Sequence, residues 1–289
     1  MLGDIRDRDL LTTRMRGVDL VFHAAAYKHV VLCEESPSEA IATNVRGTQN
    51  VIDTARNAGV RRVLFTSSDK AVNPTNVMGS SKLLAERVMT AAAGQAGDSG
   101  TVFASTRFGN VLGSRGSVVP VFAAQIARGG PITITDRRMT RFVMTVDEAA
   151  DLVLSSMTKA RGGEVFVTKM HAVEVETLAH VMRDELAPVF GYEASDVEIV
   201  EIGPQAGEKF HEELTNAEEI RRTVEEGDLF TVLPPLLDQK DPRYAELLPL
   251  NGGVLDQPYN SDTQVKMSYS ELRSYLRNRG ILDFSKGDV

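Results

Sequence analysis

Short apolar runs alternate with longer segments of helical periodicity along this chain, and this alternation constrains the fold more than any other feature. The apolar runs of strand length are residues 18–26, 60–65, 101–111, 131–135, 164–168 and 197–202. The segments with helical periodicity are residues 36–58, 80–93, 118–127, 145–160 and 175–190. Strands that alternate with helices pair in parallel through right-handed crossovers. The sequence therefore predicts an α/β fold with a Rossmann-like, doubly wound parallel sheet.

Signals at the helix ends support this reading. Pro37 stands at an early helical position, where its missing N–H costs nothing, and Gly59 is placed to end the same helix. Thr145 and Glu148 have the spacing of a capping box. A final capped helix is expected to start after Ser268.

The start of the chain lacks a feature that such a sheet normally has. A doubly wound nucleotide-binding domain begins with a strand, a glycine-rich turn and a helix N-terminus that binds pyrophosphate. Residues 3–7 instead look like the exit of a later strand, and the glycine-rich residues 109–116 follow the third predicted strand. We therefore expect an N-terminally truncated NAD(P)-binding domain in residues 1–170, without its first βαβ unit. A substrate-binding lobe and tail are expected in residues 171–289, with residues 108–145 also contributing to the substrate site.

Charge and composition argue against several classes of protein. The formal net charge is −8 and no like-charge tail occurs, so nonspecific nucleic-acid binding is not expected. Cys33 is the single cysteine, which excludes an internal disulfide and suits a reducing compartment. No apolar run approaches the ~18 residues of a membrane span, and the N-terminus does not resemble a signal peptide. We therefore expect a soluble cytoplasmic protein. The five histidines show no metal-ligand spacing, so no metal is expected and His23, His29 and His211 are read as structural.

An acid and an amine follow directly after one predicted strand. Asp69 and Lys70 come after the run at 60–65, and a second lysine, Lys82, follows in the next helix. Groups at the carboxyl end of a strand are what an open α/β sheet presents to a ligand. An isolated Asp-Lys pair is more often a surface ion pair. Lys82 and the later glycine-rich segment favour a catalytic role.

A set of short motifs identifies the family that the chain resembles. The motifs are residues 4–7, 23–30, 43–44, 68–71, 73–74, 107–111, 113–120, 139–142 and 207–209. In combination they resemble the UDP-N-acetylglucosamine 4,6-dehydratases, which belong to the extended short-chain dehydrogenase/reductase superfamily and act in bacterial polysaccharide biosynthesis. The resemblance extends from Gly3 to about Leu282. The family's first strand, glycine turn and second strand have no counterpart in these residues.

The resemblance implies a redox-neutral elimination of water. Such enzymes oxidise the sugar at C4 with NADP (or NAD), remove the C5 proton, expel the C6 hydroxyl as water and return the hydride to C6. By resemblance, Asp69 is the acid at the C6 hydroxyl and Lys70 is the base at C5. Lys82 occupies the lysine position of the superfamily's Tyr-x-x-x-Lys motif, where it holds the nicotinamide ribose and promotes proton loss.

Met78 departs from the superfamily pattern. It stands where most members have a tyrosine, and a thioether cannot relay a proton. Branches of the dehydratase family also have Met at this position. Lys82, or a water that it activates, would then deprotonate the C4 hydroxyl; the alternative is an inactive site.

The resemblance also implies binding residues. For the cofactor these are Asp4, Ile5, Ala24, Ala25, Lys28, Asn44, Ser67 and Lys82. For the UDP-sugar substrate they are Asn110 at the sugar nucleotide, Arg141 at the diphosphate and Glu208 at the uridine ribose. Gln205 stands where the family commonly has Arg, which removes one expected diphosphate contact.

Two other functions stay open at this point. One is a truncated, non-catalytic family member, and the other is a sugar-nucleotide 4-epimerase, which shares the oxidation at C4. The pair of Asp69 and Lys70 argues against an epimerase, because epimerisation expels no water. The C-terminal segment resembles the branch that inverts C5, and a homo-oligomer is expected.

Overall fold

The computed structural model describes residues 2–94, 100–204, 207–236, 241–245, 247 and 255–285. The chain divides into two compact units, each built from separate stretches of sequence. The first unit comprises Met1–Phe108, Ala150–Lys169 and Glu213–Tyr259. The second unit comprises Gly109–Ala149, Met170–Glu212 and Asn260–Val289. Residues 213–259, which the sequence analysis assigned to the substrate lobe, thus belong to the first unit.

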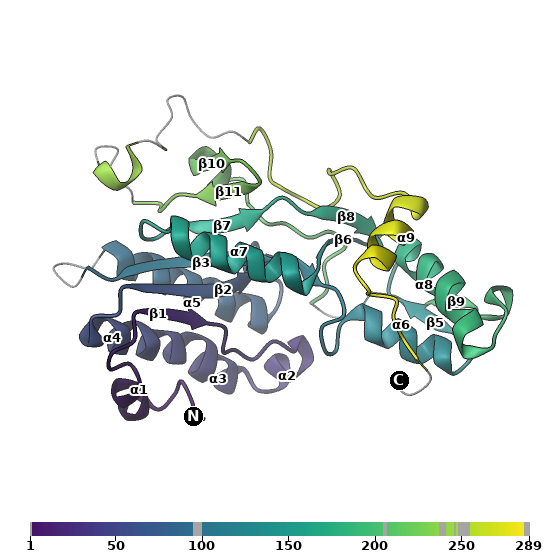
Figure 1. The fold of residues 1–289 in the computed structure, drawn as a ribbon, viewed down its shortest axis with the longest axis horizontal. Coiled ribbons are helices and arrows are strands. Elements are labelled where there is room, and N and C mark those ends of the chain that lie inside the picture. Colours follow the sequence, from purple (N-terminus) through teal and green to yellow (C-terminus); the bar gives the residue numbers. More distant parts are fainter. Residues whose placement is uncertain are drawn as a thin grey trace. The chain divides into compact units, whose positions relative to one another are not determined.

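A six-stranded sheet forms the centre of the first unit (Figure 1). In spatial order its strands are β1 (Leu20–His23), β2 (Arg62–Ser68), β3 (Val102–Phe108), β7 (Val165–Thr168), β11 (Leu229–Val232) and β10 (Thr223–Glu226). The first four strands are parallel, which confirms the α/β fold expected from the sequence. The last two form an antiparallel hairpin, which the sequence analysis did not predict.

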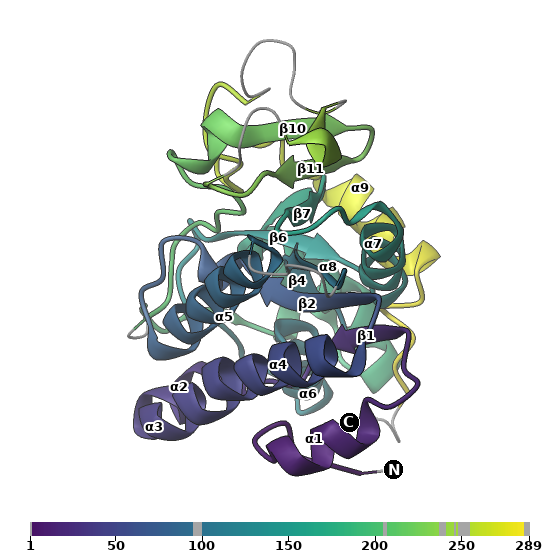
Figure 2. The same ribbon diagram turned by 90° about the vertical axis from the view of Figure 1, so that its left-hand side faces the viewer.

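Helices cover both faces of this sheet. Those of the first unit are α1 (Arg8–Arg14), α2 (Val30–Glu35), α3 (Pro37–Ala40), α4 (Thr48–Ala58) and α5 (Val77–Gly94). In Figure 2, α4 and α5 lie on one face of the sheet and α7 (Val146–Lys159) lies on the other. Apolar side chains of α4 and α5 pack with those of β2 and β3, among them Ile52, Met89, Phe65 and Phe103. The core of this unit therefore sits between the sheet and these two helices.

The helix expected from Ser36 to Gly59 is a continuous run of three segments. Pro37 starts α3, a π-helix follows over Ile41–Gly47, and α4 ends at Gly59, whose φ of 71° is left-handed. The start and the end are thus as predicted, because Pro and Gly fix them locally. Sequence patterns do not distinguish a π-helical turn from an α-helical one, and the π segment was not predicted.

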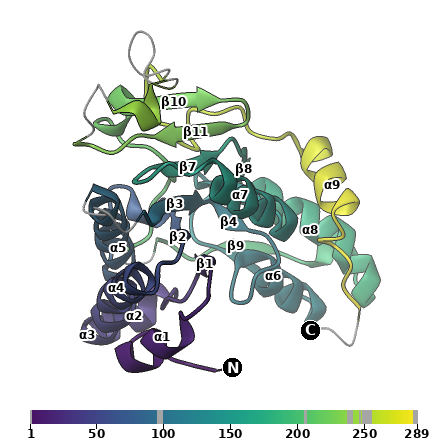
Figure 3. The same cartoon turned by 60° about the vertical axis from the view of Figure 1, so that its left-hand side comes forward.

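The second unit contains two small sheets. The first has the order β4 (Asn110–Val111), β6 (Thr140–Met144) and β8 (His171–Glu174), and the second pairs β5 (Ile132–Ile134) with β9 (Ile199–Glu201). Its helices are α6 (Val118–Ala127), α8 (Val175–Phe190) and α9 (Tyr269–Asn278). Figure 3 shows α8 beside both α6 and α9, and their buried side chains share one apolar core.

One prediction about a strand was wrong, and two other predicted strands form a sheet of their own. The strand expected at 101–111 is split at Gly109 into β3 and β4, which belong to different units. A Cβ on Gly109 would lie 2.9 Å from the carbonyl oxygen of Phe142, so glycine permits this close approach. The strands expected at 131–135 and 197–202 form β5 and β9, which pair with each other outside the six-stranded sheet. Local periodicity predicts that a strand exists but does not select its partner.

The remaining short helices are 3₁₀ turns. They are Asp69–Ala71, Ala194–Asp196, Glu219–Arg222 and Pro242–Tyr244. Within the described ranges, no helix is both long enough and apolar enough to cross a membrane.

A buried ionic cluster ties the Glu219 turn to the sheet. The guanidinium of Arg107, on β3, is fully buried and donates to Glu86 on α5 at 2.5 and 3.0 Å. It also donates twice to Glu219 at 2.7 Å and to the carbonyl oxygen of Leu214 at 2.8 Å. Burial opposes the charge, but the two carboxylates outweigh it and raise the pKa of Arg107. All three nitrogens of the Arg107 guanidinium thus have an acceptor, as burial of an ion requires.

Candidate functional site

The predicted acid and base lie at the carboxyl end of β2. The strand ends at Ser68 and the 3₁₀ turn begins at Asp69, whose side chain is 2% exposed. Nζ of Lys70 lies 3.1 and 3.2 Å from the two carboxylate oxygens of Asp69. The hydroxyl of Ser68 donates to the same carboxylate at 2.5 Å. Asp69 and Lys70 are therefore a close ion pair with the carboxylate buried and the amine one-third exposed.

Gly79 allows α5 to approach this turn. A Cβ at Gly79 would overlap the carbonyl oxygen of Lys70 and lie 3.1 Å from Cβ of Pro74. The first turn of the helix is fixed by Asn76, whose Oδ1 accepts from the N–H of Gly79 at 2.8 Å. The side chains that follow on α5, including Lys82, are thus held against the end of β2.

Lys82 is a buried amine in the first unit. Its side chain is 7% exposed, its Nζ donates to the carbonyl oxygen of Thr66 at 2.9 Å, and it lies 4.8 Å from the ring centroid of Phe65. Burial lowers the pKa of Lys82 to about 8, and the charge of Glu86 opposes that change only in part. A substantial fraction of this amine is therefore neutral at mildly alkaline pH, unlike that of an ordinary lysine.

Met78 lies in an apolar cluster. It is 3% exposed and packs with Cys33 and Ala40, with Val30 and Val77 at the edge. A packed thioether thus stands at the position where most of the superfamily has the ionisable ring of a tyrosine. Any proton transfer expected of the superfamily's tyrosine has to pass through another group.

Asn44 links three parts of the first unit from the middle of the π-helix. Its Oδ1 accepts from the N–H of Tyr27 at 2.8 Å, and its Nδ2 donates to the carbonyl oxygen of Tyr27 at 3.1 Å and to Oγ of Ser81 at 2.8 Å. The buried amide of Asn44 therefore joins the segment after β1 to the residue before Lys82. Short π segments are frequent at functional sites.

His23 belongs to the same hydrogen-bonded network. It is 3% exposed, its Nε2 lies 2.9 Å from Oγ1 of Thr48, and that hydroxyl donates to the carbonyl oxygen of Asn44 at 2.7 Å. Burial, with a smaller contribution from the charge of Lys82, lowers the pKa of His23 to about 4. The ring is therefore neutral at physiological pH. The sequence analysis read it as structural and did not foresee its hydrogen bond with Thr48.

The predicted adenine contacts lie in a loop that the π-helix and α4 hold. Gly47 gives Ile5 room, because a Cβ at Gly47 would lie 2.6 Å from Cδ1 of Ile5. The side chain of Asn50 donates to the carbonyl oxygen of Ile5 at 3.0 Å. Asp4 is exposed and accepts from the side chain and backbone of Arg6, which lowers the pKa of its carboxyl.

The remaining predicted cofactor residues lie after β1 and on β2. Ala24, Ala25 and Lys28 follow β1 and are exposed. Ser67 is buried on β2, and its hydroxyl has no hydrogen-bond partner in the described part of the chain.

Two of the predicted substrate residues, Asn110 and Arg141, converge on a carboxylate that the sequence analysis missed. Glu212 is 5% exposed and accepts from Nδ2 of Asn110 at 2.7 Å. Nε of Arg141 lies 3.4 Å from the other carboxylate oxygen. The guanidinium of Arg141 also donates to the carbonyl oxygens of Thr140 and Phe210 at 2.8 and 3.1 Å. The available signal was the position of Glu212 in the segment that also contains Glu208.

Two further residues that the resemblance singled out are Glu208 and Gln205. Glu208 is exposed in the second unit, whereas Gln205 lies outside the described residues. All predicted catalytic and cofactor residues belong to the first unit, and all described substrate residues belong to the second.

Comparison with known proteins identifies the family of the chain. Residues 1–234 match the protein family described as "Polysaccharide biosynthesis protein". The chain belongs to this polysaccharide biosynthesis family. An uncharacterized membrane protein of Methanocaldococcus jannaschii is 50% identical over 233 residues, which cover 81% of this chain and 70% of that protein.

Two kinds of named enzyme are also similar to this member of the polysaccharide biosynthesis family. A UDP-N-acetylglucosamine 4,6-dehydratase (inverting) of Campylobacter jejuni is 41% identical and covers 83% of this chain, which spans 69% of that enzyme. A UDP-glucose 4-epimerase of Rickettsia felis is 39% identical and covers 96% of this chain, which spans 79% of that enzyme. The family that the sequence resembles is therefore confirmed, and both reaction types occur among its relatives.

Solved structures confirm the Rossmann-like fold of this polysaccharide biosynthesis protein. Pen from Bacillus thuringiensis superposes with a TM-score of 0.87 at 43% identity, over 97% of this chain and 81% of that one. A dTDP-glucose 4,6-dehydratase from Streptomyces venezuelae, whose structure holds NAD, superposes with a TM-score of 0.64 at 25% identity. That match covers 72% of this chain and 68% of the dehydratase.

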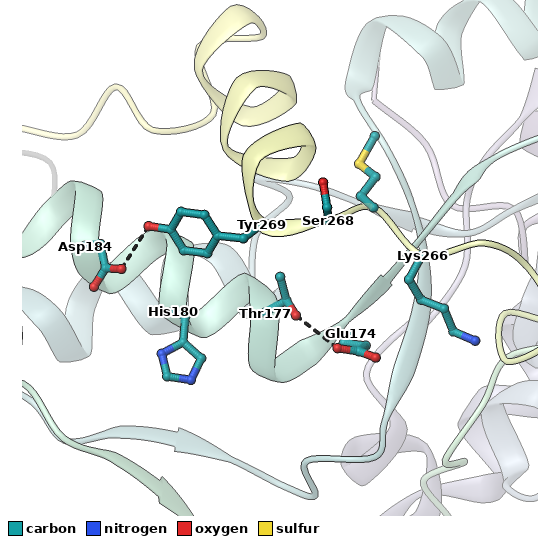
Figure 4. Close-up of a pocket in the computed structure, with 8 residues that line it drawn as sticks. Glu174, Thr177, His180, Asp184, Lys266, Ser268 and Tyr269 are labelled. Carbon is teal, nitrogen blue, oxygen red and sulfur yellow. Dashed lines mark hydrogen bonds between the residues drawn. The ribbon is translucent and has the colours of Figure 1, made fainter.

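A groove in the second unit lies apart from the Asn110–Glu212 cluster. It has a volume of about 500 Å³ and is lined by α8 and the segment that leads into α9 (Figure 4). Two pairs of its lining residues bond to each other: the hydroxyl of Tyr269 donates to Asp184 at 2.8 Å and that of Thr177 donates to Glu174 at 3.1 Å. None of the residues predicted for function in this family member lines it. Over the ranges that the structure describes, no cluster of His, Cys, Asp and Glu could hold a metal ion.

Proposed function

We propose that this protein is a nucleotide-sugar 4,6-dehydratase that converts UDP-N-acetylglucosamine to a UDP-4-keto-6-deoxy sugar. The coarser class, a nucleotide-sugar dehydratase or epimerase, is supported by the relatives' names. The observation that carries the finer proposal is the ion pair of Asp69 and Lys70 at the end of β2. An elimination of water needs a base at C5 and an acid at the C6 hydroxyl, whereas a 4-epimerisation needs proton transfer only at the C4 hydroxyl.

The ion pair of Asp69 and Lys70 can supply both the acid and the base of the elimination. Moving one proton from Nζ of Lys70 to the Asp69 carboxylate, across 3.1 Å, gives a neutral amine and a neutral acid. The amine then takes the C5 proton and the acid gives its proton to the C6 hydroxyl, which leaves as water. The electrons of the C5–H bond form the C5–C6 double bond as the C6–O bond breaks. After this step the pair is again an ammonium and a carboxylate.

A nicotinamide cofactor, NADP or NAD, would supply the hydride acceptor for oxidation at C4 and the hydride donor for reduction at C6. The ammonium form of Lys70 then returns a proton to C5 as C6 receives the hydride. The residues of the first unit that would hold the cofactor are Ala24, Ala25, Lys28, Asn44 and Ser67, with Asp4 and Ile5 at the adenine. Lys82 takes the proton of the C4 hydroxyl, directly or through water, since Met78 cannot. Its lowered pKa of about 8 supports this role, because the neutral amine is the base.

The substrate is assigned to residues of the second unit. Asn110, Arg141 and Glu208 would contact the sugar nucleotide, its diphosphate and its uridine ribose. Inversion at C5 is the favoured outcome, in keeping with the inverting relative of Campylobacter jejuni. A cytoplasmic location and a homo-oligomeric state remain predictions from the sequence.

The second candidate is a UDP-sugar 4-epimerase, which the Rickettsia felis relative favours through its coverage of 96% of this chain. One incubation separates the candidates. UDP-N-acetylglucosamine and NADP or NAD are mixed with the protein in D₂O, and the nucleotide sugar is analysed by mass spectrometry and NMR.

Dehydration gives a product lighter by one water that carries solvent deuterium at C5. The coupling constants of this product also report the configuration at C5. An isomer of unchanged mass without solvent deuterium would instead identify an epimerase. An unchanged substrate with both cofactors would favour the non-catalytic alternative.

A further inference from the structure

The amide of Asn110 has one fixed orientation. Its Nδ2 donates to Oε2 of Glu212 at 2.7 Å and to the carbonyl oxygen of Phe142 at 3.2 Å. The reverse orientation would place the amide oxygen against a carboxylate and a carbonyl, with three acceptors facing one another. Both hydrogens of the Asn110 amide are therefore committed within the second unit, and its Oδ1 is the atom left for a ligand.

Glu212 is built into the second unit from several directions. Its carboxylate also accepts from the N–H of Phe142 at 3.3 Å. Ser261 also holds the main chain of Glu212. The N–H of Glu212 donates to the Ser261 hydroxyl at 2.9 Å, and the carbonyl oxygen of Glu212 accepts from the Ser261 N–H at 2.8 Å. The Ser261 hydroxyl in turn lies 2.7 Å from Oγ1 of Thr140. The carboxylate of Glu212 cannot rotate without breaking its hydrogen bonds with Asn110 and Phe142, so it orients these two partners.

Gly109 and β6 place Asn110 against this carboxylate. Asn110 is in register with Val143 in the parallel pair of β4 and β6. A side chain at Gly109 would meet Cβ and the carbonyl oxygen of Phe142 at 2.9 Å, so only glycine allows the two strands this spacing. The hydrogen bond from Asn110 to Glu212 is therefore a consequence of the backbone arrangement.

We propose that Glu212 is a positioning residue that makes Asn110 a pure hydrogen-bond acceptor toward the substrate. The substrate group at Asn110 is then a donor, namely a sugar hydroxyl or an N–H of the nucleotide sugar, and never a phosphate oxygen. The same carboxylate lies 3.4 Å from Nε of Arg141, so it positions that guanidinium as well. This inference rests on the proposed function in that it takes Asn110 as a substrate contact.

The test is a double-mutant cycle in the full chain. Glu212→Gln replaces the anionic acceptor of Asn110, and its ion pair with Arg141, by a neutral amide, and Asn110→Asp brings two carboxylates together. In the double variant, the glutamine amide introduced at position 212 can donate to one oxygen of the aspartate introduced at position 110, while the other oxygen still faces the ligand. Glu193→Gln, which alters an exposed carboxylate of the second unit, is the matched control.

We expect each single variant to weaken binding of UDP-N-acetylglucosamine by roughly ten- to a hundredfold in calorimetry, as for loss of a hydrogen bond to a charged group. KM should rise accordingly with little change in kcat. The double variant should recover at least part of the affinity, and the control should bind like the wild type. Unchanged affinity in a folded Glu212→Gln variant, or no recovery in a folded double variant, would overturn the proposal.

A second measurement does not depend on turnover or substrate. The side-chain amide of Asn110 is assigned by NMR from its disappearance in Asn110→Asp. A downfield, slowly exchanging Nδ2 proton that moves upfield in Glu212→Gln supports the positioning role, and a signal that does not respond refutes it. Failure of the wild type to bind any UDP-sugar, with this signal as expected, would instead count against the proposed function.

Discussion

Nζ of Lys82 donates to the main-chain carbonyl oxygen of Thr66 at 2.9 Å, which holds the amine at the carboxyl end of β2. The acceptor of this hydrogen bond is a neutral carbonyl group and not a carboxylate. Burial therefore determines its ionisation, and the pKa falls to about 8 although Glu86 opposes the change. This relationship makes Lys82 an amine that can lose its proton near neutral pH.

The first prediction concerns the pH dependence of the oxidation step. Lys82 is protonated below pH 8 and neutral above it, so kcat/KM should rise with pH and level off above an apparent pKa of about 8. Lys82→Arg keeps the charge but cannot lose its proton, so it should be inactive at every pH. A pH–rate profile of the wild type from about pH 6 to about pH 10 checks this. A flat profile between about pH 7 and about pH 9 would contradict the role of Lys82 as base.

The second prediction concerns the acid–base pair. Asp69→Asn and Lys70→Ala should each lower dehydration at least roughly a hundredfold, because a general acid or base typically contributes that much or more. Cofactor binding should stay close to normal. Asp19→Asn, which alters an exposed carboxylate 3.9 Å from Arg61, is the control. Retention of more than about a tenth of the turnover in either variant would show that its assigned role is wrong.

The third prediction uses two glycines of one helix. Gly79→Ala forces a methyl group onto the carbonyl oxygen of Lys70, so the turn with the acid–base pair or α5 must shift. Overpacking of this kind typically costs about 1–3 kcal/mol, and turnover should fall with it. Gly94→Ala lies near the end of α5 with nothing within 4 Å, and it should leave turnover and stability unchanged or raise the stability. Urea unfolding and turnover of both variants decide the matter; equal effects would argue against the close contact.

The fourth prediction links His23 to acid stability. Its pKa is about 4 in the folded chain and about 6.5 in the unfolded chain, so the unfolded chain binds the extra proton between these values. Stability should therefore fall as the pH drops from about 6.5 to about 4, by on the order of 3 kcal/mol from this group.

Urea unfolding at about pH 7 and about pH 4.5 measures that loss. His23→Gln should lose less stability than the wild type between the two pH values, since it has no imidazole to protonate. His180→Gln, at a histidine whose side chain is 38% exposed, is the matched control and should behave like the wild type. Equal losses in the wild type and His23→Gln would show that the buried imidazole does not titrate in this window.

The amino-acid sequence alone determined the α/β class, several of the helices and the position of Asp69 and Lys70 directly after a strand, but it did not predict α1 or α2. Helices 118–127 and 175–190 were predicted with the bounds that the structure shows for α6 and α8. The capping boxes at Thr145–Glu148 and Ser268–Glu271 are present as hydrogen bonds. These features are local, so a few neighbouring residues are enough to specify them.

Only the tertiary structure decided which distant groups meet. The hydrogen bonds of Asn110 with Glu212, of Asn44 with Ser81 and of His23 with Thr48 join residues far apart in the sequence. The same holds for the pairing of β5 with β9 and for the burial of Arg107. Hydrogen bonding and burial, which set these contacts and the pKa of each buried group, are properties of the packed chain and have no signature in local periodicity.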